Sequence, residues 1–159
     1  MIALRFAHVF FGALWVGMMA FGTFVVGPAV EEIGPEGGKV MAALQRRHIM
    51  LIMPLFALIT LLSGFWLFSR LAGGNMSALM ATPMGRAFAF GGAAALIAFL
   101  IGIVVMRPAM MRAQRLMQSR DPAFAPEIQR LRRRGNVQGR VVGVLLLLAL
   151  AAMAVARYL

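Results

Sequence analysis

Four long apolar runs constrain this chain more than any other feature of its sequence. They are free of formal charge at pH 7 if His8 is neutral, and they cover residues 6–30, 49–69, 87–106 and 141–156. The first three are long enough to cross a bilayer as helices at about 1.5 Å per residue. The last has 16 residues, but Arg140 and Arg157 flank it and can extend toward the membrane surface. The sequence therefore predicts an all-α integral membrane protein, a four-transmembrane-helix bundle in a single membrane domain.

The helices are predicted over about residues 4–28, 46–70, 85–107 (continuing as a cytoplasmic helix to about 119) and 138–158. The first loop is expected to begin with the breakers at Pro28 and to end in an amphipathic segment leading into the second helix. DPAFAP, at residues 121–126, is expected to break the chain between the third and fourth helices. The basic segment after it leads into the fourth.

Positive charge is distributed unequally between the two sides of the predicted bundle. Nine arginines lie between the third and fourth runs, and the first loop adds Lys39, Arg46 and Arg47 on the same side. The other side has Arg5, Arg70, Arg86 and Arg157. The positive-inside rule predicts both long loops in the cytoplasm and both termini outside, in a bacterial inner membrane. No aromatic platform alternates with the charges, so we expect attraction to anionic lipid and no binding to nucleic acid.

The polar residues exclude several kinds of chemistry. There is no cysteine, which excludes disulfides, thiolate metal sites and covalent haem attachment within the chain. The four runs contain no Asp, Glu or Lys, which argues against a transporter with a membrane carboxylate and against acid–base catalysis in the membrane. Two histidines, fourteen methionines and interfacial arginines remain, and they are better suited to ligation than to hydrolysis.

His8 is the only ionisable side chain in the first run, and an ionisable group inside a membrane is by default a candidate functional residue. Gly12 and Trp15 follow on the same helical face, where we expect space for a porphyrin edge and an indole to pack on it. Met153, Arg5, Arg70, Arg86 and Arg157 are predicted at a similar depth. Met153 is a candidate second ligand, and arginines pair well with propionates. The pattern predicts b-type haem bound through His8.

Other interpretations of these residues remain open. His8 can instead bond to a neighbouring helix, and His48, near the opposite face, is a weaker metal candidate. Met76, Met80 and Met84 are spaced four apart, which suits copper handling together with His8, or a short amphipathic segment in the headgroups. A cofactor-free structural subunit of a membrane complex is a third alternative.

The first two predicted helices resemble known families. H-x6-W-x-G, formed by His8, Trp15 and Gly17, resembles the start of copper-resistance-D-like membrane domains and of the four-helix membrane protoporphyrinogen oxidase of the J type. LQRRHIMLIMPLFALITLLSG resembles the second-helix entry of that oxidase group. The resemblance implies that His8 is a haem ligand and that Arg47 is the arginine opening the second helix. The third helix departs from the oxidase pattern, because it lacks the lysine and the further histidine. If the chain is an enzyme, we expect an oxidoreductase.

Small residues predict self-association. Gly12, Gly17 and Gly22 in the first helix, and residues 91–95 in the third, offer more small-residue surface than one bundle needs. We therefore expect a homo-oligomer, in which two copies of His8 can approach one axis. A redox role also requires an electron-transfer partner.

Overall fold

The computed structural model describes residues 1–119 and 121–159, with every side chain among them except those of residues 35 and 45. Arg120, one of the arginines discussed above, lies outside the described residues. Within these ranges the protein is all-α and contains no strand. Four helical stretches are long and apolar enough to cross a membrane: Ile2–Ile33, Ile49–Ala72, Pro83–Gln118 and Pro122–Ala156. The prediction of a four-helix membrane protein is confirmed at this level.

Each stretch contains one or more regular elements. The first consists of α1 (Ile2–Phe21), the π-helical turn η1 (Gly22–Val26) and α2 (Gly27–Ile33). The short helices η2 (Gly34–Glu36) and α3 (Gly37–Arg46) lead to α4 (Ile49–Ala72), which α5 (Met76–Ala81) follows. The third consists of α6 (Pro83–Leu100), the π-helical turn η3 (Ile101–Met106) and α7 (Arg107–Gln118). The last begins with the 3-10 turn η4 (Pro122–Phe124) and continues as α8 (Ala125–Ala156).

Two helices extend further than the sequence indicated. The first continues through Pro28 to Ile33, so the expected loop does not begin at the proline. Pro28 directly follows the π-helical turn and is the second residue of α2, so the change in hydrogen-bond pattern occurs next to the proline. The fourth helix begins at Ala125 rather than near residue 138. A hydrogen bond from Asn136 to Glu31 and an ion pair between Arg112 and Glu127 hold this polar extension against α2 and α7.

The four helices pack in a ring of neighbours. α6 and α8 share the most extensive contact, α1 and α4 the next, and the contacts α1–α8 and α4–α6 close the ring. The core is built mainly of small residues: Trp15, Ala57, Ala94, Ala95, Ala98, Val142, Leu146 and Ala149. Small side chains allow helix backbones to approach closely, which provides the van der Waals contact that stabilises helix pairs in lipid.

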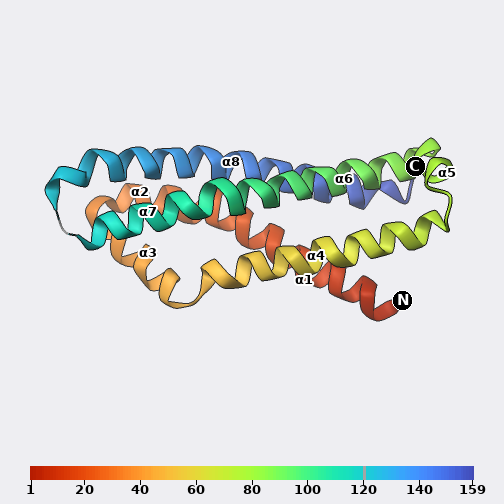
Figure 1. The fold of residues 1–159 in the computed structure, drawn as a ribbon, viewed down its shortest axis with the longest axis horizontal. Helices are drawn as coiled ribbons and strands as arrows, with labels where there is room; N and C mark the ends of the chain where they lie inside the picture. Colours follow the sequence, from red (N-terminus) through yellow and green to blue (C-terminus); the bar gives the residue numbers. More distant parts are fainter. Residues whose placement is uncertain (120) are drawn as a thin grey trace.

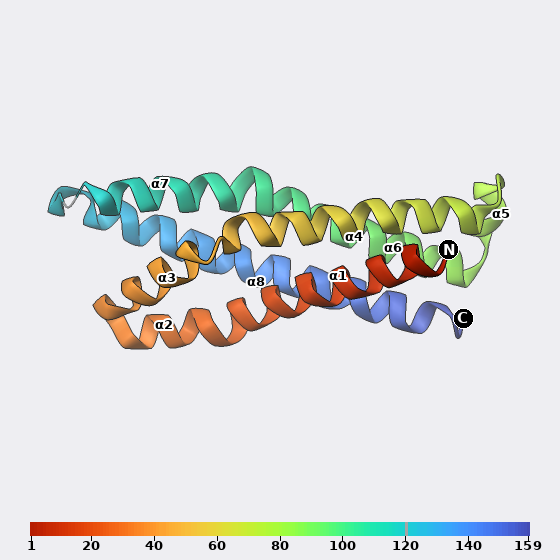
Figure 2. The same ribbon diagram turned by 90° about the horizontal axis from the view of Figure 1, so that it is seen from below.

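The two ends of the bundle differ in charge. Both termini and α5 lie at one end, and α2, α3, α7 and the start of α8 lie at the other (Figure 1). The view from below shows the same separation (Figure 2). We call the second end the basic end, because it contains the arginines of both long connections. All five acidic residues of the chain also belong to segments at the basic end.

Candidate functional site around His8

His8 lies against the middle of α4. Its Nδ1 is 2.9 Å from the backbone carbonyl oxygen of Thr60. A carbonyl oxygen can only accept a hydrogen bond, so Nδ1 carries the proton and donates it. In a neutral imidazole the lone pair then lies on Nε2, which has no hydrogen-bond partner among the described residues. The contact therefore fixes both the ring orientation and the tautomer that can bind a metal.

The surface of α4 that contacts the imidazole consists of small residues, and the hydroxyl groups on it are hydrogen-bonded to backbone carbonyls of α4. Thr60 Oγ1 donates to the carbonyl of Phe56 at 2.7 Å, and Ser63 Oγ donates to that of Ile59 at 2.6 Å. Gly64 lies directly beside the ring, since a Cβ there would be 2.7 Å from His8 Cε1. Only glycine at position 64 allows this close approach. His8, Thr60, Ser63 and Gly64 are called the His8 seat below.

Gly12 and Trp15 both pack against other residues of the bundle. A Cβ on Gly12 would be 3.3 Å from Thr60 Cγ2, so Thr60 fills the space expected for a porphyrin edge. Trp15 is 4% exposed and belongs to the core cluster, where it packs with Ala57 rather than on an open face. Both residues thus support the α1–α4 contact and the bundle core. They act on the His8 seat by fixing how closely the helices approach.

The four arginines predicted near His8 belong to the end of the bundle that holds the termini. Arg5 lies one turn before His8, Arg70 is in the last turn of α4, Arg86 is in the first turn of α6, and Arg157 follows α8. All four are exposed, and the guanidinium carbon of Arg157 lies 5.1 Å from the centroid of the Tyr158 ring. No acidic residue belongs to the segments at this end. The arginines are therefore available for an anionic group supplied from outside the chain.

Met153, the predicted second ligand, does not lie beside His8. Its Cγ would be 3.0 Å from a Cβ on Gly91, which places Met153 in the α6–α8 interface, whereas His8 faces α4. Met76, Met80 and Met84 do not share one helix face either. Met76 and Met80 belong to α5, and Met84 follows Thr82, whose extended backbone separates α5 from α6. Across the described residues no group of three or more His, Cys, Asp or Glu side chains could hold a metal ion.

His48 lies in the turn before α4, at the other end of that helix from Arg70. It is exposed and adopts the left-handed conformation with φ +57°, and it is the only non-glycine residue with a positive φ among those described. Histidine tolerates this conformation better than most residues. His48 thus acts in chain reversal, far along α4 from the His8 seat.

Sequence reasoning could not pair Thr60, Ser63 and Gly64 with His8. The Thr60 backbone carbonyl, the actual hydrogen-bond partner, has no residue-specific signal in a sequence. One turn further along α1, Phe11 packs on Phe56 of α4 with ring centroids 5.3 Å apart. This contact between two helices likewise cannot be read from the sequence.

No protein-family model matches the chain, and no curated protein and no solved structure matches it either. The resemblance of the first two helices stays a prediction from their motifs.

Proposed function

We propose that the protein binds b-type haem through Nε2 of His8, in a redox or haem-handling role. The observation that supports the proposal is the hydrogen bond from Nδ1 to the Thr60 carbonyl. Ligand histidines in proteins commonly donate their other ring N–H to a carbonyl, which fixes the ring and raises its basicity. A histidine held in this way has the form of a metal ligand.

Two arginines on the helices that hold His8 support the proposal. Phe6 and Phe10 stack on each other with ring centroids 5.3 Å apart, but each is two residues from His8, so their exposed face lies on the other side of α1 from the imidazole. Arg5 lies one turn toward the end of α1, and Arg70 follows Ser63 by seven residues on the same face of α4. These two guanidinium groups support the proposal, because arginine pairs well with carboxylates such as the propionates of haem. Bound haem would supply one-electron chemistry.

Of the predicted ligands only His8 would hold the haem iron, because Met153 packs in the α6–α8 interface. Any further ligand would be a small molecule or His8 of another copy in a homo-oligomer. Gly12 and Gly91 are in contact with other helices of the bundle. A Cβ on Gly17, Gly22 or Gly92 would meet nothing within 4 Å, so these three glycines have no such contact. Cross-linking in native membranes is expected to give dimers or larger species, and monomer alone would contradict self-association.

The first experiment is an absorption spectrum of the detergent-purified full chain, expressed with sufficient haem, followed by the haem-to-protein ratio. We expect a Soret band that shifts on reduction and a stoichiometric amount of bound haem. Copper that survives dialysis, with no Soret band, would favour copper handling. Neither haem nor copper would favour a structural subunit. No observation favours the copper alternative, since Thr82 separates the methionines.

We further propose that the basic end faces the cytoplasm of a bacterium and that the termini are outside its inner membrane. The arginines of both long connections lie together at the basic end (Figure 1). Cytoplasmic loops are enriched in arginine and lysine. A reporter fused after Leu159 that functions only outside the cytoplasm is expected to be active, and activity of a cytoplasm-only reporter would contradict this topology.

Gly64→Ala is expected to weaken haem binding by about 10–100-fold, the range seen when groups that orient a metal ligand are altered. The new methyl would lie 2.7 Å from His8 Cε1, so the ring must leave its contact with the Thr60 carbonyl. Haem titration followed at the Soret band measures the effect. The control is Gly92→Ala, which adds the same methyl to a membrane glycine with nothing within 4 Å. Equal affinity of the two variants would show that the His8 seat is not the site.

A further inference from the structure

The side chain of His8 faces the interior of the bundle. His8 precedes Trp15 by seven residues, close to two helical turns, so the two side chains lie on one face of α1. Trp15 is 4% exposed and belongs to the core cluster. Thr60, whose carbonyl accepts the hydrogen bond from His8, is likewise buried on the inner face of α4. A ligand bound to Nε2 is therefore expected on the interior side of the α1–α4 pair.

This interior side is packed in the middle of the bundle but not toward the end that holds the termini, called the termini end below (Figure 1). From these two helices, the core cluster and the residues packed on it include Trp15, Val16, Met19, Phe56, Ala57 and Leu61. Among the described residues, the cluster takes none of α1 before Trp15 and none of α4 after Leu61. The α1–α4 and α6–α8 pairs are thus not joined through the core beside His8.

Burial falls along the inner face of α4 in the same direction. Thr60 is 7% exposed, Leu67 on the same face is half-buried, and Leu71 is 46% exposed. Nε2 of His8 is 3.7 Å from the position of a Cβ on Gly64. Leu67 follows Gly64 by three residues, so it lies about 4.5 Å further along the helix. The inner face of α4 therefore leads from the free nitrogen of His8 to the termini end.

We infer that Leu67 lines the entrance to the His8 site, and that this entrance opens between the α1–α4 and α6–α8 pairs at the termini end. The inference rests on the proposed function, since haem is the ligand. An apolar side chain suits the porphyrin, and Arg70, three residues further on, suits propionates directed toward water. An approach from the lipid across Phe6 and Phe10 would instead reach the side of α1 away from the imidazole.

Leu67→Trp tests the entrance by filling it. We expect haem to bind about tenfold more weakly, because the indole would overfill the space next to Gly64. The matched control is Leu62→Trp, which makes the same change at a residue that is 62% exposed and lies on the opposite side of α4 from Thr60. Haem titration followed at the Soret band measures both. Equal affinity of the two variants would overturn the inference.

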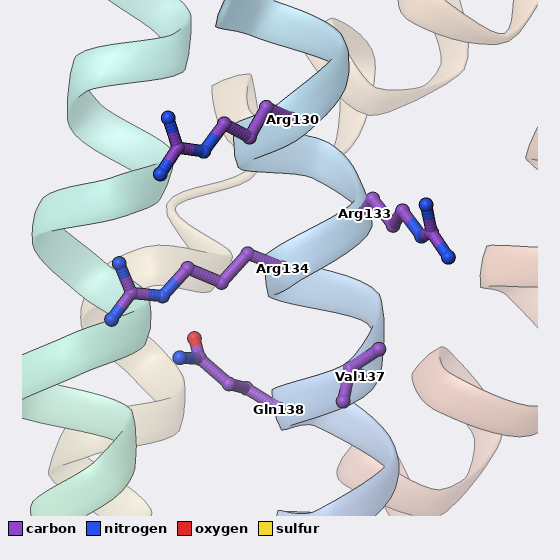
Figure 3. A pocket seen from close by; sticks show the side chains of 5 residues that line it. All are labelled: Arg130, Arg133, Arg134, Val137 and Gln138. Carbon is purple, nitrogen blue, oxygen red and sulfur yellow. The ribbon is translucent and has the colours of Figure 1, made fainter.

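Cysteine labelling tests the opening without haem, because the chain has no cysteine of its own. The full chain in nanodiscs is treated with a water-soluble maleimide. The exposed reference is Val137→Cys, at a residue that is 57% exposed next to Gln138 on α8 at the basic end (Figure 3). Leu67→Cys should react at a similar rate. Ala57→Cys should be at least about a hundredfold slower, because a buried thiol reacts only when the bundle opens locally.

Haem loading then shows which side of the site is covered. It should slow the labelling of Leu67→Cys by about tenfold, as the loss of affinity in Leu67→Trp would lead us to expect. Trp66→Cys, at the next residue and on another face of α4, should keep its rate. Equal protection of both, or protection of Phe10→Cys instead, would overturn the entrance.

The two proposals fail in different ways. Labelling of Leu67→Cys as slow as that of Ala57→Cys would overturn the entrance even in a chain with a full Soret band. A wild type without a Soret band would contradict haem binding, whereas rapid labelling of Leu67→Cys would still show the opening.

Discussion

His8→Ala is expected to abolish haem retention while the protein remains inserted and folded. The change removes the proposed ligand, and the Thr60 carbonyl keeps its place within α4. No other histidine can replace it, because His48 lies in the turn at the far end of α4. The measurement is the Soret absorbance per protein after purification, with circular dichroism and gel filtration to confirm the fold.

His48→Ala is the matched control, since it also removes one imidazole but from an exposed turn at the basic end. Its haem content should equal that of the wild type. Added imidazole should partly restore the Soret band of His8→Ala, because it can occupy the space that the side chain left. A full Soret band in His8→Ala, together with its loss in His48→Ala, would move the site to the other end of the bundle.

Gly91→Leu is expected to lower the stability of the bundle. A Cβ at this position would be 3.1 Å from the Ala149 carbonyl oxygen and 3.0 Å from Met153 Cγ. The backbone of α8 cannot move aside as a side chain can, so the larger leucine must push α6 and α8 apart. Overpacking of a close contact costs about 1–3 kcal/mol, and this one opens the most extensive interface of the bundle. Thermal and SDS-induced unfolding in detergent measure the change.

Gly92→Leu provides the comparison on the next residue. A Cβ there meets nothing within 4 Å, so the same side chain would extend from the bundle at no packing cost. Leucine also has a higher helix propensity than glycine. We expect stability close to or above that of the wild type. Equal destabilisation of both variants would mean that α6 does not pack on α8 through Gly91.

The sequence alone predicted the membrane class and the four helical stretches. The reason is that an uncharged run of spanning length has few alternatives: in lipid every backbone group must be bonded within the segment. The charge distribution likewise predicted which connections share an end of the bundle, and Figures 1 and 2 show both long connections opposite the termini. The helix ends were less well predicted. Pro28 is compatible with continued helix after a π-helical turn, and the polar residues 125–138 become helical through contacts with α2 and α7.

Which residues meet was decided by the tertiary structure. His8, Gly12 and Trp15 lie on one face of α1, but helical spacing does not predict which residues lie opposite that face. The partner is the backbone carbonyl of Thr60, while Thr60 Cγ2 fills the space at Gly12 and Trp15 enters the core. Met153 shares the predicted depth of His8 and yet packs on Gly91. Hydropathy fixes depth along the membrane normal, whereas the rotation of each helix about its own axis follows from close packing of small residues, and that packing depends on all four helices together.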